Sequence, residues 1–175
     1  ICLQPLNMAE LVTKSEAEWR SAALQRMLGV EGFDVVVVCT GTEWQAKFWQ
    51  ARLERGKGYV IPASCQVVCV HEDWKSGGAG NGLGTLYAMR KAAAAYDGDV
   101  VAKLNAGEVS VAIYHTAGKG TRLAPLPGAE NNNKPGVKLP ASAPVGEGGA
   151  SVPLTILESV IKQTGVYAAC RKGRL

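Results

Sequence analysis

The sequence predicts an α/β domain, a three-layer sandwich built on a mainly parallel β-sheet, from two observations. Helical patterns alternate along the chain with short β-branched runs, and this alternation is typical of βαβ units with right-handed crossovers. The run "FDVVVVC" at residues 33–39 is nearly continuous in apolar side chains, as expected of a strand that is buried on both faces of a parallel sheet. The length of 175 residues fits a single domain, 1–175.

Local signals place the elements in order. Helices are expected at residues 16–28, 43–55, 85–96 and 154–163, and strands at 34–39, 66–70 and 109–114. Ser15 and Glu18 form a capping box for the first helix, and Thr42 with Gln45 caps the second. Pro153 is expected in the first turn of the last helix.

Two further segments carry structural expectations. Trp44, Phe48 and Trp49 fall on one stripe of the second helix and are expected to pack in the core rather than to stack on bases. Residues 124–150 are rich in proline, glycine and asparagine, and we expect them to form a long irregular loop. A loop of this length inside a domain is usually functional or disordered.

Composition excludes several classes of protein. The net charge of +4 comes from scattered cations, so we expect no nucleic-acid partner. No apolar run reaches the roughly 18 residues that a transmembrane helix needs. Five cysteines without a CxxC pair indicate reduced structural thiols in a soluble protein of a reducing compartment, the cytosol or an organelle stroma. No zinc site is predicted, because the only histidines, His71 and His115, lack ligand spacing.

Both ends of the sequence indicate a longer protein. The sequence begins at Ile1, and "TGVYAACRKGRL" at the other end is typical of the start of a further strand. We therefore expect the chain to be the nucleotide-binding part of a longer protein, with possible protein partners in a larger assembly.

Glycine-rich segments follow two of the expected strands. In an open parallel sheet, ligands bind at the carboxyl ends of the strands. Glycine lets backbone N–H groups approach phosphate oxygens, and nearby cations supply charge. The sequence therefore predicts a cationic phosphate pocket formed by the 116–122 backbone with Arg122 and Lys134, beside a loop at 77–85. The second segment, "AGKGTRLAPL", is neither a Walker A motif nor a dinucleotide fingerprint, and an ordinary turn is the alternative.

The wider pattern resembles sugar-1-phosphate nucleotidyltransferases. Their signature is a glycine-rich loop with Thr-Arg-Leu, then Pro-Leu and a later Lys-Pro, found here as Gly118, Gly120, Thr121, Arg122, Leu123, Pro125, Leu126, Lys134 and Pro135. The upstream stretch, with "GLGTL" at 82–86, is similar to L-fucose-1-phosphate guanylyltransferases, including those fused to fucokinase. The resemblance spans about residues 19–175 and implies the fold of the nucleotide-diphospho-sugar transferases, here its N-terminal part.

The resemblance implies a reaction between a nucleoside triphosphate and a sugar-1-phosphate, with Mg²⁺ as cofactor. Arg122 and Lys134 are the expected catalytic residues, Arg122 with Lys119 on the triphosphate and Lys134 on the α- or sugar phosphate. The expected substrate-binding residues are Gly118, Lys119, Gly120, Thr121, Gly82, Gly84 and Thr85.

The sequence departs from the family pattern at the metal site. No aspartate follows Asp99, so the aspartate that binds Mg²⁺ in the family is expected outside these residues, and the 175 residues alone are expected to be inactive. Asp73 and Trp74 are interpreted either as ligand contacts or as a loop anchor, and His115 either as a phosphate contact or as a structural histidine. The alternative function is a non-catalytic structural or interaction subunit that retains the fold.

Overall fold

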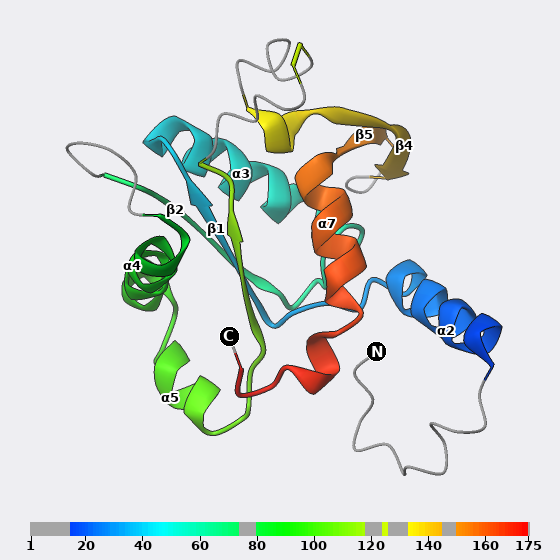
Figure 1. Cartoon of the computed structure of the whole chain (residues 1–175), viewed down its shortest axis with the longest axis horizontal. Coiled ribbons are helices and arrows are strands. Elements are labelled where there is room, and N and C mark those ends of the chain that lie inside the picture. The colour runs from blue at the N-terminus through cyan, green and yellow to red at the C-terminus, as the bar shows by residue number, and fades with distance from the viewer. Residues whose placement is uncertain (1–14, 74–79, 118–123, 126–132, 145–149, 175) are drawn as a thin grey trace.

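A three-stranded parallel sheet forms the centre of the molecule. The computed structural model describes residues 15–73, 80–117, 124–125, 133–144 and 150–174. Strand β1 (Val35–Thr40) lies between β2 (Gln66–His71) and β3 (Val111–His115), and both pairings are parallel (Figure 1). The expected parallel α/β arrangement is therefore confirmed, and β1 and β3 do not form a hairpin.

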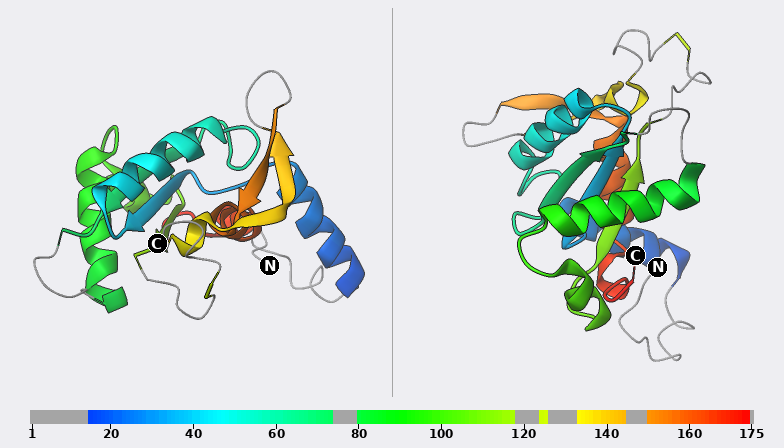
Figure 2. Two further views of the ribbon diagram at one scale, coloured as in Figure 1. Left: turned by 90° about the horizontal axis from the view of Figure 1, so that it is seen from above. Right: turned by 90° about the vertical axis from the view of Figure 1, so that its left-hand side faces the viewer.

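Helices cover both faces of this sheet. Val36 and Val38 of β1 pack in a core with Trp49 and Leu53 of α3 (Glu43–Arg55) and with residues of α7 (Ile156–Gly165). The alternate side chains of β1 pack in a second core with Ala88 and other residues of α4 (Gly80–Ala95) and with α5 (Val100–Asn105). The right-hand view of Figure 2 shows α4 in front of the sheet. Because β1 is buried on both faces, its β-branched run has no polar face.

Strand register aligns the carboxyl ends of the three strands. Cys39 is the Cα partner of Val70 in β2 and of His115 in β3. Ladder-type hydrogen bonds continue beyond the strands, since Glu72 N–H donates to Thr40 O (2.8 Å) and Thr116 N–H donates to Cys39 O (2.8 Å). The segments that leave β2 and β3 are thereby fixed beside the end of β1.

The expectation of an irregular loop at 124–150 is wrong in part. Its described residues include the 3-10 helix η2 (Lys134–Gly136) and β4 (Lys138–Pro144), which pairs antiparallel with β5 (Ser151–Thr155). Pro153 lies in β5 and not in a helix. The side-chain hydroxyl of Thr155 instead caps α7, in a capping box with Glu158.

Three other expectations need correction. Helix α4 begins at Gly80, so Gly82, Gly84 and Thr85 lie in its first turns rather than in a loop. The segment near the carboxyl end that was expected to begin a strand instead forms the 3-10 helix η3 (Ala168–Cys170). Helix α5 was not predicted. Trp49 is buried as expected, whereas Trp44 is 60% exposed and stacks on Phe48.

The cysteines differ in their state. Cys39 and Cys65 are buried free thiols and Cys69 is a half-buried one, as expected. Cys170 forms a disulfide, so the expectation that all five cysteines are reduced is wrong for this residue. Burial raises the pKa of both Cys65 and Cys69 to about 12, because a thiolate loses its hydration in the core.

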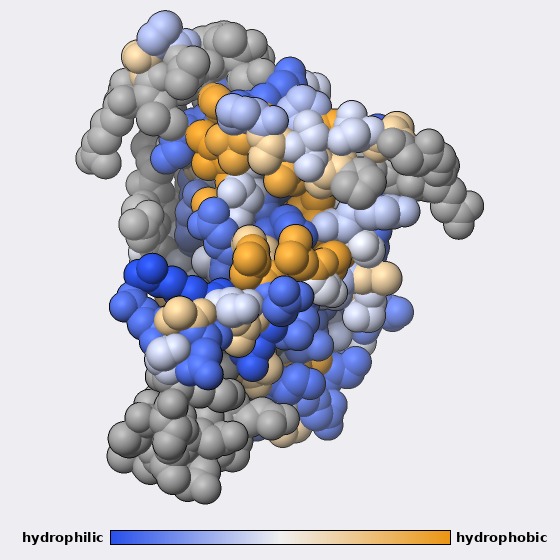
Figure 3. Space-filling model, turned by 90° about the vertical axis from the view of Figure 1, so that its right-hand side faces the viewer, coloured by the Kyte–Doolittle hydropathy of each residue, from blue (hydrophilic) through white to orange (hydrophobic). Residues whose placement is uncertain are grey.

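Helix α2 (Glu16–Leu28) packs at the side of the molecule. It has the predicted capping box of Ser15 and Glu18, but none of its residues is buried. Its Leu24 and Leu28 are 48% and 63% exposed. Figure 3 shows this side, where hydrophobic side chains lie in separate areas among hydrophilic ones. In the part of the chain that the structure describes, every helix is too short or too polar to cross a bilayer.

A buried ion pair joins α3 to α7. Glu158 is 2% exposed, and both of its carboxylate oxygens accept hydrogen bonds from Arg52, at 2.8 and 2.7 Å. The same carboxylate accepts from the backbone N–H (2.8 Å) and hydroxyl (2.7 Å) of Thr155. Arg52 also donates to the carbonyl of Pro153 at 2.9 Å. The buried charge is therefore compensated by several donors.

Replacing Arg52 should destabilise the protein strongly. In Arg52→Met the Glu158 carboxylate remains buried without its cation, and we expect the free energy of unfolding to fall by about 3 kcal/mol. The control is Lys47→Met, which removes an exposed pair with Glu43 and should change stability by less than about 0.5 kcal/mol. Urea unfolding measures both, and equal losses would contradict the assignment.

Burial of Cys65 should make stability fall at alkaline pH. Above the ordinary thiol pKa of 9.0, the unfolded chain has lost this proton, whereas the folded chain keeps it up to about 12. Stability therefore decreases as pH rises through this window, by up to about 1.4 kcal/mol per pH unit for one thiol. Urea unfolding at several pH values should show a shallower decrease for Cys65→Ala. Parallel pH curves for the two proteins would refute the prediction.

Candidate active site

A cleft of about 540 Å³ lies beside the carboxyl end of β3. Its apolar wall comes from α7, through Ile156, Leu157 and Val160. Its polar lining residues are Glu72, Tyr114, His115, Thr116 and Lys134. This is the edge at which open parallel sheets bind ligands.

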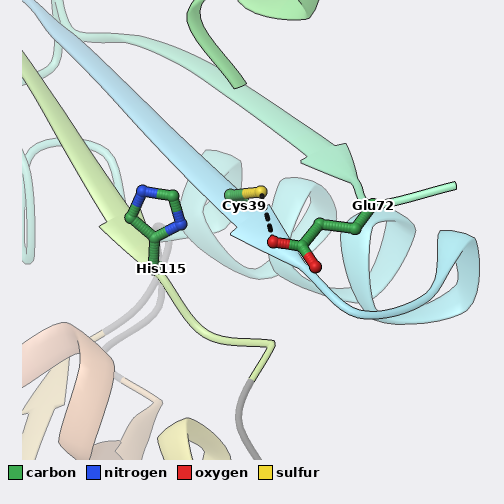
Figure 4. A group of neighbouring side chains, drawn as sticks. All are labelled: Cys39, Glu72 and His115. Carbon is green, nitrogen blue, oxygen red and sulfur yellow. Dashed lines mark hydrogen bonds between the residues drawn. The ribbon is translucent and has the colours of Figure 1, made fainter. Parts of the chain in front are cut away.

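Three metal-ligating side chains meet next to this cleft. Cys39, Glu72 and His115 come from or directly follow the ends of β1, β2 and β3, and each offers a ligand atom within 4.8 Å of the other two. Figure 4 shows the thiol of Cys39 between the carboxylate of Glu72 and the imidazole of His115. Cys39 is buried, Glu72 is half-buried and His115 is exposed. The cluster therefore reaches from the core to the cleft.

Helix α4 holds the imidazole of His115. Its Nε2 lies 2.9 Å from the hydroxyl of Thr85, within hydrogen-bond distance. A Cβ atom on Gly84 would lie 3.4 Å from both Glu72 Oε1 and His115 Cε1, so a side chain larger than that of alanine would enter the cluster. The first turns of α4 thus fit closely against the ends of β2 and β3.

The electrostatics of the cluster keep the thiol of Cys39 protonated at neutral pH. Burial, and then the neighbouring charge of Glu72, raise the pKa of Cys39 to about 11, although Lys91 acts in the opposite direction. The Sγ atom lies 4.0 Å from Glu72 Oε1, with the thiol as donor.

Asp73 is an anchor for the segment after β2. Its carboxylate lies 3.0 Å from the ammonium of Lys91, which also donates to the carbonyl of His71 at 3.0 Å. Hydrogen bonding to Lys91 lowers the pKa of Asp73. The structure thus favours the loop-anchor interpretation of Asp73, while Trp74 lies outside the described residues.

The structure describes only some of the predicted site residues. Lys134 lies at the cleft, exposed at the start of η2, and Thr85 contacts His115. Gly82 is exposed and Gly84 buried in the first turns of α4. Gly118, Lys119, Gly120, Thr121 and Arg122 lie outside the described residues. Ala117, the last described residue before the motif, and Lys134 both line the cleft.

The donor set of the cluster does not suit Mg²⁺. Magnesium prefers oxygen ligands in octahedral geometry, and Glu72 alone of the three residues supplies a carboxylate. The neighbouring Asp73 is already paired with Lys91. Among the described residues, we therefore assign no site for the Mg²⁺ that the resemblance implies.

The sequence analysis missed the cluster of Cys39, Glu72 and His115. Their separation along the chain hides any ligand spacing, and the expectation of no metal site followed from spacing alone. A signal was present, because each residue lies at the end of a predicted strand of one parallel sheet or within two residues after it. Parallel strands that are neighbours bring such positions together.

The chemical character of the cleft combines a cation, Lys134, with the donors of the cluster and an apolar wall. Such a lining can bind an anionic ligand that also has an apolar part.

Compared with models of protein families, with curated proteins and with solved structures, the chain matches none of them.

Proposed function

We propose that this chain is the nucleotide-binding part of a sugar-1-phosphate nucleotidyltransferase. The observation that supports the proposal is that Lys134 and the residue before the glycine motif, Ala117, line the same cleft. The Gly-Lys-Gly-Thr-Arg motif begins directly after the lining residue Ala117, and Lys134, the later motif lysine, lines the same cleft. The described residues on either side of the motif segment, Ala117 and Lys134, therefore line one cleft at the strand ends.

The proposed fold class follows from the same arrangement. A three-layer sandwich of the nucleotide-diphospho-sugar transferase type needs a parallel sheet with helices on both faces. The three parallel strands, with α3 and α7 on one face and α4 and α5 on the other, are compatible with it. Binding at the carboxyl ends of the strands is common to open parallel sheets.

The proposed reaction is a nucleotidyl transfer. A phosphate oxygen of the sugar-1-phosphate attacks the α-phosphorus of a nucleoside triphosphate. The bond from the α-phosphorus to the bridging oxygen breaks, and pyrophosphate leaves with that oxygen. Mg²⁺ would neutralise triphosphate oxygens in such a reaction. A protein accelerates this step chiefly by positioning the reactants and by stabilising charge.

The cationic residues have distinct roles in this proposal. Lys134, exposed at the edge of the cleft, neutralises the α- or sugar phosphate. Arg122 and Lys119 hold the triphosphate, for which a guanidinium offers two parallel hydrogen bonds. The apolar wall of α7 faces the less polar part of the ligands.

Removing Lys134 should weaken triphosphate binding. Loss of one charge-assisted contact is worth about 1.5 kcal/mol, or roughly tenfold in affinity for Lys134→Ala. Arg122→Ala should cost about 1.5–3 kcal/mol, because a guanidinium can make two contacts. The control is Lys103→Ala on α5, which precedes the amino end of β3. Calorimetric titration with a nucleoside triphosphate measures each affinity, and equal values for all variants would count against the site.

Pyrophosphate release tests the reaction itself. We expect turnover when the protein that carries this sequence is given a nucleoside triphosphate and a sugar-1-phosphate, with guanosine triphosphate and a fucose phosphate tried first. Lys134→Ala should lower the rate while Lys103→Ala keeps it. Absence of turnover with all common triphosphates and several sugars would support the alternative, a non-catalytic subunit. Turnover by residues 1–175 alone would show that their metal ligands lie within these residues.

A further inference from the structure

We propose that Cys39, Glu72 and His115 form a binding site for one zinc-class divalent metal ion. The three side chains converge from three different strand ends, next to a cleft that an ion can enter from solvent. The inference rests on the described residues of the cluster and is independent of the proposed nucleotidyl transfer.

The distances within the cluster suit a single ion. Since the three ligand atoms lie within 4.8 Å of one another, a point between them lies within about 3 Å of each. Zinc needs roughly 2.0–2.3 Å to these ligand types, so side-chain movements of less than about 1 Å complete the site. Glu72 is half-buried and His115 is exposed, so their side chains make most of this adjustment while Cys39 stays in the core.

Helix α4 orients His115 for metal binding. The Nε2 atom of His115 is within hydrogen-bond distance of the Thr85 hydroxyl, which leaves Nδ1 as the ring nitrogen for an ion. Figure 4 shows one nitrogen of the imidazole on the side of Cys39 and Glu72. Metal-binding histidines usually have their second nitrogen fixed by such an outer partner. Gly84 leaves the space beside Glu72 and His115 free of a side chain.

The donor types select the class of ion. A thiolate, an imidazole and a carboxylate match Zn²⁺ or Co²⁺ and disfavour Mg²⁺ and Ca²⁺, which prefer oxygen ligands. When the sulfur–metal bond forms, the Cys39 thiol releases its proton to solvent. Three protein ligands leave a fourth position of the zinc tetrahedron. Because Glu72 and His115 line the cleft, that position is available to water or to a substrate oxygen there.

The experiment uses Co²⁺ as a spectroscopic probe and Zn²⁺ as competitor, with no nucleotide present. We expect one Co²⁺ per chain, a thiolate-to-cobalt charge-transfer band, and displacement of the band by Zn²⁺ but not by Mg²⁺. Cys39→Ser should abolish the band. Glu72→Gln and His115→Ala should each weaken binding by at least about tenfold, and Thr85→Val by roughly 10- to 100-fold.

Two matched controls come from β2, the strand that Glu72 follows. Cys69→Ala removes a free thiol that packs in the core on the opposite face of the sheet. His71→Ala removes the chain's other histidine, the residue before Glu72. Both should keep the band and the affinity of the natural protein.

Several outcomes would overturn the proposal. They are absence of Co²⁺ and Zn²⁺ binding by the natural protein, a band that persists in Cys39→Ser, or equal losses in the control variants. Since Cys39 is buried, circular dichroism must show that Cys39→Ser is folded. If it is not, Glu72→Gln and Thr85→Val decide, because unchanged affinity in both would exclude the site. None of these metal-binding measurements depends on turnover, so they test the metal site separately from the proposed function.

Discussion

Parallel pairing of β1 on both of its edges is the constraint on which the rest of the structure depends. A strand between two parallel neighbours has its backbone hydrogen bonds satisfied within the sheet, and connections between parallel strands must cross over a face of that sheet. In this chain the crossovers carry α3 on one face, and α4 and α5 on the other. The same pairing fixes the register in which Cys39 lies beside His115. Core and candidate site therefore have a common origin in the sheet.

The ion pair of Arg52 and Glu158 connects this core to the wall of the cleft. Glu158 completes the capping box of α7 and also binds Arg52 of α3, so one carboxylate fixes both the start and the position of α7. Ile156, Leu157 and Val160, from the first turns of the same helix, line the cleft. A buried charge is costly unless it is fully hydrogen-bonded, and here four donors to one carboxylate meet that requirement. The shape of the cleft thus depends on a polar interaction outside it.

The cleft is bordered by two chemically different sets of residues. Lys134 in η2 carries a positive charge that is suited to phosphate oxygens. Cys39 and His115 supply softer sulfur and nitrogen donors next to the cleft, and Glu72 adds a carboxylate. A metal ion held by the second set would add positive charge at the same strand ends. The two proposals therefore describe neighbouring parts of one cleft, although each rests on its own residues.

The sequence by itself determined the three parallel strands and four of the helices, because local signals suffice for them: β-branched runs, amphipathic periods and the caps at Ser15 and Thr42. It also predicted roles for Lys134 and Thr85, and the structure places Lys134 at the cleft and Thr85 beside His115. Only the tertiary structure decided the antiparallel pairing of β4 with β5, because that segment has weak strand signals and depends on its partner strand. It also decided the start of α4 at Gly80, because the glycines there locally favour a loop. The cluster of Cys39, Glu72 and His115 also required tertiary structure. Its members are far apart in the chain, and strand order and register, which local sequence does not encode, bring them within 4.8 Å.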